Sequence, residues 1–345
     1  MFENYAQNKR IIPSIQSLYF DRFIHVFHLF FRFFHPLDIF WIMATQQTIW
    51  FILNPKSGTL KPQARQRILD YLNFKVLSVN THAKIRFTEY AGHATLIAQE
   101  AVAAQIDVVI AIGGDGTINE VAKGLLYSNT KLGIIPIGSG NGLARHLGIS
   151  MNPYEALEEV LNSKSFKIDA CFLNEIPFFC TAGLGFDAQV AHHFAKQTTR
   201  GLWTYIKSAF LCFFSFKPVF YDIQINGENR TQKYFTITFA NATQYGNDAL
   251  IAPNALINDG LIDVCLLKPY PFFMGIYMAI RLFWGNIDKS EYMEIIKTDE
   301  IKLSQEQEII FHFDGEPAVL KTNQLNVKIK KQVLNVICPL ANTTI

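Results

Sequence analysis

The feature that most constrains this chain is a repeated unit in which a short apolar run ends in a glycine-rich loop and a helical pattern follows. In the clearest example, Asp107 to Ile112 is an apolar run that ends in the loop Gly113 to Thr117, before a helical pattern from about Ile118 to Leu126. A continuous apolar run is typical of a strand covered on both faces, and strands that alternate with helices predict a parallel sheet. We therefore expect an α/β domain over residues 47–165.

The same alternation extends through the rest of this region. We expect further strands at Trp50 to Leu53, Lys84 to Thr88 and Leu132 to Ile137. We expect helices where apolar residues recur at helical spacing, which is the case at Pro62 to Leu72, His93 to Gln105 and Pro153 to Leu161.

A different pattern begins after about Phe166, where strands follow one another without regular helices between them. Apolar and polar residues alternate from Tyr221 to Ile225, and again from Phe235 to Phe239 after the hairpin signal Asn226-Gly227. Residues 166–340 are therefore predicted to form an antiparallel, β-rich second domain. Two aromatic stretches, Gly201 to Phe216 and Tyr270 to Trp284, are long enough to be helices.

Charge and cysteine content exclude several classes of protein. The formal net charge is +2, and no dense run of Lys and Arg is present, so nucleic acid is not an expected partner. The five cysteines are widely spaced and contain no CxxC pair, which fits neither a disulfide framework nor a zinc site. A cytoplasmic location is expected.

Residues 1–46 form an atypical aromatic extension. The stretch Phe23 to Met43 is interrupted near its middle by Pro36 and Asp38, whereas a membrane span needs about 20 uninterrupted apolar residues. No small-residue cleavage site marks a secretory signal. The segment is an interfacial anchor, a packed appendage, or translated sequence upstream of the native start at Met43, and we favour the last interpretation.

Three glycine- and serine-rich loops are expected to lie together, because the carboxyl ends of parallel strands share one edge of the sheet. Glycine allows a close approach of the backbone to a phosphate, and the helix that follows offers unpaired N–H groups. Outside the loop at Gly113, the candidate ligand-binding residues on these loops are Asn54, Ser57, Gly58, Ser139 and Asn141.

Asp115 is the informative residue, since a carboxylate within a phosphate-binding loop repels the ligand unless a divalent cation or hydrogen bonds offset its charge. Mg²⁺ is the economical choice. The loop lacks the GxxxxGK pattern of a Walker A motif and the GxGxxG pattern of a dinucleotide loop.

Three motifs in succession resemble those of the diacylglycerol kinase catalytic domain family, the bacterial soluble lipid kinases related to sphingosine and ceramide kinases. They are NPKSG at Asn54 to Gly58, GGDGTINE at Gly113 to Glu120, and IPIGSGNGLARHLGI at Ile135 to Ile149. The resemblance covers nearly all of Thr48 to about Cys338. It implies a two-domain fold like that of phosphofructokinases and NAD kinases, with a C-terminal antiparallel β-sandwich for the lipid whose last strands can return to the first domain.

The resemblance also implies which residues contact ATP. In the bacterial members these contacts fall on a Thr after the second strand, on the GGDGT loop with its neighbours, and on a small hydroxyl residue of the third loop. Transferred to this sequence, the nucleotide-binding residues are Thr88, Gly113, Gly114, Asp115, Gly116, Thr117, Ile118, Asn119 and Ser139.

A carboxylate is expected to accept the proton of the alcohol during phosphoryl transfer. Ile309 to Phe313 is predicted to be a strand ending in the turn Asp314-Gly315-Glu316-Pro317, which would project both acids beyond the sheet. Pro317 favours an extended backbone at Glu316. This turn is similar to the C-terminal motif of the family, which implies that Glu316 is the general base and that Asp314 assists it, alongside Asp115.

A second metal site follows from the resemblance alone. In similar bacterial lipid kinases, a structural Mg²⁺ is held by an Asp side chain and two flanking Leu carbonyls. In this sequence these are Asp259 and the carbonyls of Leu256 and Leu261.

The sequence therefore predicts an ATP- and Mg²⁺-dependent lipid kinase that works at the inner membrane face, with peripheral contact through exposed aromatics around Trp203 or Trp284. The two aromatic stretches are core helices or the borders of a cleft for acyl chains. A kinase of soluble substrates such as an NAD kinase, and a regulator without catalysis, are the alternatives. The acceptor lipid stays open, and the resemblance is compatible with a homodimer.

Overall fold

The computed structural model describes residues 47–57, 62–78, 82–197 and 201–339. The expectations for residues 1–46 and for Gly58 lie outside these residues. The chain divides into two compact units, Met1–Gln46 and Gln47–Ile345, and the fold described below is that of the second unit. Within the described residues, no helix is both long enough and apolar enough to span a bilayer.

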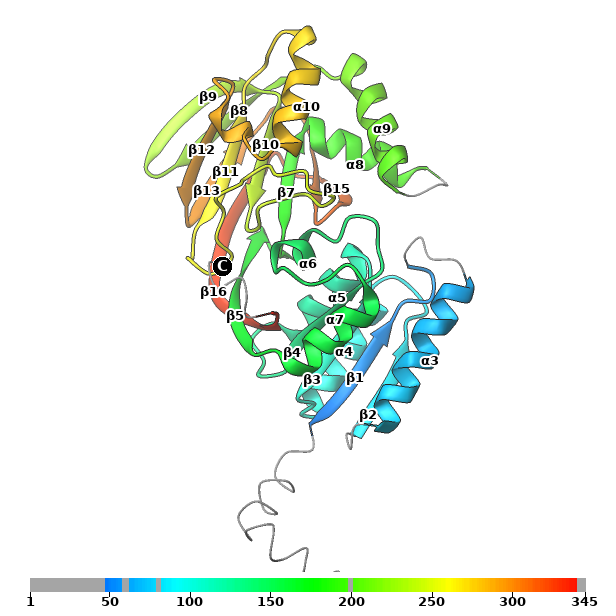
Figure 1. The fold of residues 1–345 in the computed structure, drawn as a ribbon. Coiled ribbons are helices and arrows are strands. Elements are labelled where there is room, and N and C mark those ends of the chain that lie inside the picture. The colour runs from blue at the N-terminus through cyan, green and yellow to red at the C-terminus, as the bar shows by residue number, and fades with distance from the viewer. Residues whose placement is uncertain (1–46, 58–61, 79–81, 198–200, 340–345) are drawn as a thin grey trace, which may run out of the picture. The chain divides into compact units, whose positions relative to one another are not determined.

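The first half of this unit is a parallel sheet covered by helices on both faces (Figure 1). The strands, in spatial order, are β2 (His82–Phe87), β1 (Thr48–Leu53), β3 (Val108–Gly113) and β4 (Lys131–Pro136). The helices are α3 (Pro62–Ser78), α4 (His93–Ala103), α5 (Asp115–Leu125), α6 (Gly142–His146) and α7 (Pro153–Asn162). The predicted α/β domain is thus observed.

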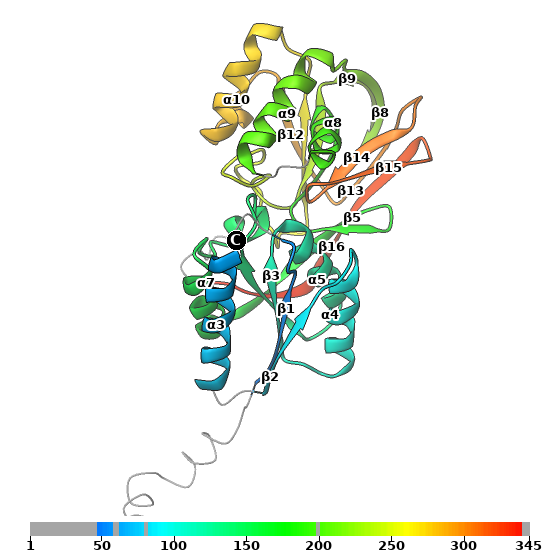
Figure 2. The ribbon, with the colours of Figure 1, turned by 90° about the vertical axis from the view of Figure 1, so that its right-hand side faces the viewer.

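Alternate residues of β3 face opposite layers of helices, which explains its uninterrupted apolar sequence. Val109 and Ala111 pack in the cluster that contains apolar residues of α4 and α5. Ile110 and Ile112 pack in the cluster that contains apolar residues of α3 and α7. Figure 2 shows α3 and α7 on one side of the sheet and α4 and α5 on the other.

The last strand, β16 (Gln324–Ile337), joins the two halves of the unit. It pairs in parallel with β4 through Asn335 and Val336, and in antiparallel fashion with β5 (Ser165–Leu173) and β13 (Glu300–Ser304). The parallel sheet therefore continues into the second half, where it ends with β8 (Val219–Ile225) and β9 (Glu228–Tyr234).

A six-stranded antiparallel sheet packs against this extension to form a β-sandwich. Its strands, in spatial order, are β12 (Met293–Thr298), β11 (Ile262–Leu267), β10 (Thr236–Ala240), β7 (Thr181–Gly185), β14 (Ile309–Phe313) and β15 (Glu316–Leu320). The short β6 (Ile176–Phe178) pairs with β5. Tyr221, Ile223 and Ile225 of β8 share a buried core with residues of the second sheet, including Phe239. The predicted fold class, α/β followed by an antiparallel β-sandwich, is confirmed.

Helices cover the outer face of the six-stranded sheet. They are α8 (Phe186–Ala195), α9 (Leu202–Ser215), η1 (Phe272–Met274), α10 (Gly275–Phe283) and η2 (Ile287–Lys289). The helices predicted at Gly201 to Phe216 and Tyr270 to Trp284 are observed. Helix α8, which follows β7 directly, was not predicted.

Two expectations were wrong in detail. The strand that returns from Asn226-Gly227 is β9, whereas β10, predicted to alternate, belongs to the other sheet and is buried along its whole length. The reason is that β10 lies between β7 and β11 and is covered on both faces. Helix α5 begins at Asp115 instead of Ile118, so much of the predicted glycine loop is the first turn of this helix.

Candidate active site

The second and third glycine loops lie against each other at the carboxyl ends of β3 and β4. A Cβ atom on Gly138 would lie 2.6 Å from the Cα atom of Gly114, and one on Gly113 would lie 2.5 Å from the Cβ atom of Thr117. Real Cβ atoms essentially never lie within 3.0 Å of such heavy atoms, so these positions require glycine for reasons of packing within the protein. This packing is a second reason for the glycines, besides the approach to a phosphate predicted from the sequence.

Asp115 connects these two loops. Its Oδ2 accepts a hydrogen bond from the Asn141 N–H at 2.9 Å, and its Oδ1 accepts one from the Gly142 N–H at 2.8 Å. Burial raises the pKa of the Asp115 carboxyl, the two backbone donors oppose this shift, and the neighbouring Asp314 adds to it. The sequence left two ways to offset the charge of Asp115, a divalent cation or hydrogen bonds, and the structure shows the hydrogen bonds.

The first loop joins the same site through Asn54. Its Nδ2 donates to Thr117 Oγ1 at 3.2 Å, and its carbonyl accepts from the Ser57 hydroxyl at 2.9 Å. Thr88, at the end of β2, is buried and its N–H donates to the carbonyl of Leu53 at 2.9 Å. Asn54 therefore lies beside the first turn of α5, whereas Thr88 lies beside the end of β1.

The third loop carries Ser139, which is half-buried, and Asn141, which is buried in the left-handed conformation with φ of 53°. The Nδ2 group of Asn141 donates to the carbonyl of Gly138 at 2.9 Å. Its buried Oδ1 has no hydrogen-bond partner among the described residues. A buried acceptor of this kind is usually satisfied by water or a ligand.

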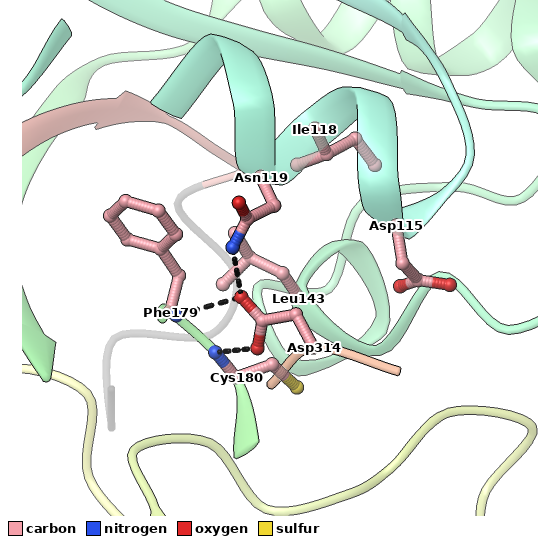
Figure 3. A pocket seen from close by; sticks show the side chains of 7 residues that line it. All are labelled: Asp115, Ile118, Asn119, Leu143, Phe179, Cys180 and Asp314. Carbon is pink, nitrogen blue, oxygen red and sulfur yellow. Dashed lines mark hydrogen bonds between the residues drawn. The ribbon is translucent and has the colours of Figure 1, made fainter. Parts of the chain in front are cut away.

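Asp314 differs from its predicted placement. Instead of projecting beyond the sheet, its carboxylate is held by four donors, of which those of Asn119, Phe179 and Cys180 are drawn in Figure 3. They are the N–H groups of Phe179, Cys180 and Thr181, at 2.9, 2.8 and 3.0 Å, and the Nδ2 of Asn119 at 2.6 Å. Burial nevertheless raises the pKa of the Asp314 carboxyl, against the effect of these donors.

Glu316 is exposed and begins β15, as Pro317 predicted. A Cβ atom on Gly116 would lie 2.6 Å from its Oε1, so this carboxylate lies directly over the first turn of α5. Desolvation and the charges of Glu120 and Asp314 raise the pKa of the Glu316 carboxyl, and Lys123 opposes them. The three predicted catalytic carboxylates are thus brought to one place.

A small pocket lies where α5, α6 and the turns of the β-sandwich converge (Figure 3). Its lining residues are Asp115, Ile118, Asn119, Leu143, Phe179, Cys180 and Asp314. Two of the three carboxylates therefore border the same cavity, together with the apolar side chain of Ile118.

A buried polar cluster behind the turn was not predicted from the sequence. Asp187 Oδ2 lies 3.2 Å from His312 Nε2, and it accepts hydrogen bonds from Thr238 Oγ1 at 3.1 Å and from Tyr245 OH at 3.2 Å. The cluster requires Gly183, where a Cβ atom would lie 2.1 Å from the same oxygen. The one sequence signal that could have indicated this cluster is His312, which lies two residues before Asp314. Its partner Asp187 belongs to helix α8, which was not predicted.

The carboxylate of Asp259, the side-chain ligand of the expected second metal site, has partners within the protein. Asp259 Oδ2 accepts from Lys297 Nζ at 2.9 Å, and Asp259 Oδ1 accepts from the Leu261 N–H at 3.0 Å. Lys297 Nζ also lies 3.4 Å from Asp263. In this structure the ammonium group supplies the positive charge, and a metal at Asp259 Oδ2 fits only if Lys297 withdraws.

Two family models match successive parts of the chain. The model of the diacylglycerol kinase catalytic domain matches residues 48–173, and that of the YegS C-terminal NAD kinase beta sandwich-like domain matches residues 180–338. A crystal structure of a diacylglycerol kinase from Bacillus anthracis superposes with a TM-score of 0.66 and 20% identity, covering 86% of this chain and 98% of that chain. The fold and the converging glycine loops define a two-domain kinase.

The family follows from the sequence relatives. A protein of Chromohalobacter salexigens named "Probable lipid kinase YegS-like" is 30% identical over 274 residues, which is 78% of this chain and 86% of the relative. A Bacillus subtilis protein named diacylglycerol kinase is 29% identical over 273 residues, 77% of this chain and 88% of that protein. The chain belongs to the YegS-like lipid kinase family.

Proposed function

We propose that this kinase transfers the γ-phosphoryl group of ATP to the hydroxyl of a membrane lipid, with Glu316 as general base. The observation that carries this proposal is the position of the Glu316 carboxylate over Gly116, in the first turn of the helix that follows the glycine loop. A base at this point can accept a proton from an alcohol that approaches a phosphate bound at the helix N-terminus.

Glu316 takes the proton of the lipid hydroxyl as its oxygen forms a bond to the γ-phosphorus, and the bond from that phosphorus to the β–γ bridging oxygen breaks. The products are a phosphorylated lipid and ADP. Glu316 is a better base than Asp314, because four donors already hold the Asp314 carboxylate, whereas no described residue donates a hydrogen bond to that of Glu316.

The nucleotide is proposed to lie over the three loops. The N–H groups at the start of α5 favour negative charge, and Thr88 and Ser139, which follow β2 and β4, are proposed as further contacts. Each Asp115 oxygen accepts one N–H and retains capacity for a further partner, so this carboxylate is compatible with a Mg²⁺ that arrives with ATP. Such an ion supplies neutralisation of phosphate charge.

The acceptor is proposed to be a lipid with a hydroxyl next to an apolar body, such as diacylglycerol or a sphingoid base. The family and the Bacillus subtilis relative named diacylglycerol kinase support this class. With such a substrate, the enzyme is expected to work in the cytoplasm at the inner face of the membrane.

A panel of lipids tests the proposal. Labelled ATP is incubated with diacylglycerol, sphingosine, ceramide, phosphatidylglycerol or undecaprenol in mixed micelles, or with NAD, using the wild-type chain, Glu316→Gln and, as a control at another exposed glutamate, Glu306→Gln. We expect one lipid class to be phosphorylated, a loss of at least about 100-fold in Glu316→Gln with nucleotide binding retained, and no change in Glu306→Gln. Phosphorylation of NAD in place of every lipid, or full activity of Glu316→Gln, would overturn the proposal.

A further inference from the structure

Helices α9 and α10 expose most of their apolar side chains. Exposed fractions reach 83% for Trp203, 62% for Phe210 and 59% for Phe214, and they are 77%, 77% and 75% for Phe273, Ile276 and Trp284. We name these six residues the aromatic face. The two helices bury little in return, since only Ser208, Cys212 and Met278 among their residues are fully buried. Packing of the core therefore does not explain their composition.

The two helices form one continuous surface. The ring of Phe272, in the turn before α10, lies 5.3 Å from the rings of both Phe213 and Phe214 of α9. Gly275 permits this approach, because a Cβ atom there would lie 2.7 Å from Phe213. Figures 1 and 2 both show α9 and α10 next to each other on the β-sandwich. Contiguous exposed apolar surface of this kind marks an interaction site.

Within the two stretches that carry the aromatic face, every charged side chain is a cation, although Lys268 Nζ lies 4.0 Å from Glu294 Oε2 of β12. Residues 201–217 and 268–284 contain no Asp or Glu, and they contain Lys207, Lys217, Lys268 and Arg281. In the whole chain, by contrast, 31 Lys and Arg residues are balanced by 29 Asp and Glu residues. Aromatic side chains with flanking cations match the boundary between acyl chains and anionic headgroups.

A packed path connects this surface to the catalytic turn. Tyr205 of α9 lies 5.6 Å, between ring centroids, from Phe194 of α8. On the other side of α8, His192 Nε2 lies 3.1 Å from the carbonyl oxygen of Ala318 in β15, the strand that begins with Glu316. Because α8 contacts both α9 and β15, it fixes the position of the aromatic face relative to Glu316, the proposed base.

We propose that the aromatic face docks into the interfacial region of an anionic bilayer and thereby presents the active site to its lipid. This inference rests on the proposed function, which requires access to a substrate within a membrane. The other candidate occupants of the aromatic face are a second copy of the chain and residues 1–46. The positive charge of residues 201–217 and 268–284 favours an anionic bilayer over both.

Vesicle flotation with the full chain tests the docking site. The double variant Phe273→Ser/Trp284→Ser is compared with Phe74→Ser/Phe220→Ser, which removes two rings of similar exposure, 65% and 57%, outside the face. On phosphatidylcholine vesicles with phosphatidylglycerol, we expect the face variant to lose at least about tenfold in partitioning and the control to match the wild type. Equal partitioning of all three proteins would overturn the proposal.

Three further measurements separate the remaining outcomes. The face variant is expected to retain turnover of a short-chain, water-soluble acceptor. If the wild type does not turn over this acceptor, the result counts against the proposed function, whereas the vesicle result still stands. If the face variant unfolds by circular dichroism, Lys207→Glu/Lys217→Glu serves instead, with the loss expected only on vesicles that contain phosphatidylglycerol. A face variant that converts a dimer to a monomer by light scattering, with vesicle binding intact, would assign the surface to a second copy and overturn the docking.

Discussion

Asn119 Nδ2 donates a hydrogen bond of 2.6 Å to Asp314 Oδ2, and this bond joins the helix of the glycine loop to the turn that carries Glu316. The two residues are 195 positions apart in the chain. The same carboxylate accepts backbone donors of Cys180 and Thr181, so it connects α5 to the start of β7 as well. We therefore expect Asp314 to position the proposed base, a role consistent with an acid in the turn that does not itself face solvent.

Replacement of Asp314 by Asn is expected to weaken both stability and turnover. An amide offers one acceptor oxygen and places an N–H group against donors, so buried donors lose their partner. We expect a loss of about 2 kcal/mol in the free energy of unfolding and a clear fall in kcat, with KM for ATP little changed. Asn119→Ala, which removes one of the four donors, is expected to cost about 1 kcal/mol. Urea denaturation and steady-state kinetics measure both, and a larger effect of Asn119→Ala would contradict this order.

The raised pKa of Glu316 sets the acid limb of the pH profile. A general base works deprotonated, so kcat/KM is expected to fall as the pH drops through a pKa above the usual glutamate value. Glu120→Gln removes a charge that raises this pKa and is expected to move the limb to lower pH. Lys123→Met removes an opposing charge and is expected to move it to higher pH. Shifts of both variants in the same direction would exclude Glu316 as the titrating group.

Lys297 provides a direct test of the second metal site. Its ammonium is bound to Asp259 at 2.9 Å, where the family resemblance implies Mg²⁺. In Lys297→Met the carboxylate loses its cation, so we expect Mg²⁺ to raise the Tm of this variant by at least about 2 °C more than that of the wild type. Asp259→Asn should abolish the rise. Thermal melts in EDTA and in Mg²⁺ measure it, and an equal response of wild type and Lys297→Met would show that the two cations do not share this site.

The fold was largely predictable because its elements repeat one local pattern. Strand β3 could be predicted because burial on both faces makes its sequence continuously apolar. The strand Ile309–Phe313 could be predicted from the turn that ends it. Helix α8 was not predicted because its sequence, FDAQVAHHFA, is short and has only a weak helical periodicity of apolar residues. The resemblance supplied the candidate residues at the site, but their contacts depend on the packing of distant segments. No local sequence pattern indicates that Asp314 accepts hydrogen bonds from residues 179–181, or that Asp259 pairs with Lys297.

Gly138 is expected to tolerate no side chain, because the two glycine loops touch through their backbones. A Cβ atom there would lie 2.6 Å from the Cα of Gly114 and 2.7 Å from Asn141 Oδ1, so Gly138→Ala forces the loops apart. Overpacking of this kind costs about 1 to 3 kcal/mol. If this cost destabilises the ATP-bound state, the affinity for ATP falls by roughly tenfold or more. We expect KM for ATP to rise by about this factor in Gly138→Ala. Ser139→Ala, in the same loop, removes a hydroxyl without crowding and is expected to leave the Tm unchanged while Gly138→Ala lowers it. Nucleotide titration and thermal melts of the two variants check this, and an unchanged KM and Tm in Gly138→Ala would show that the contact between the loops does not shape the nucleotide site.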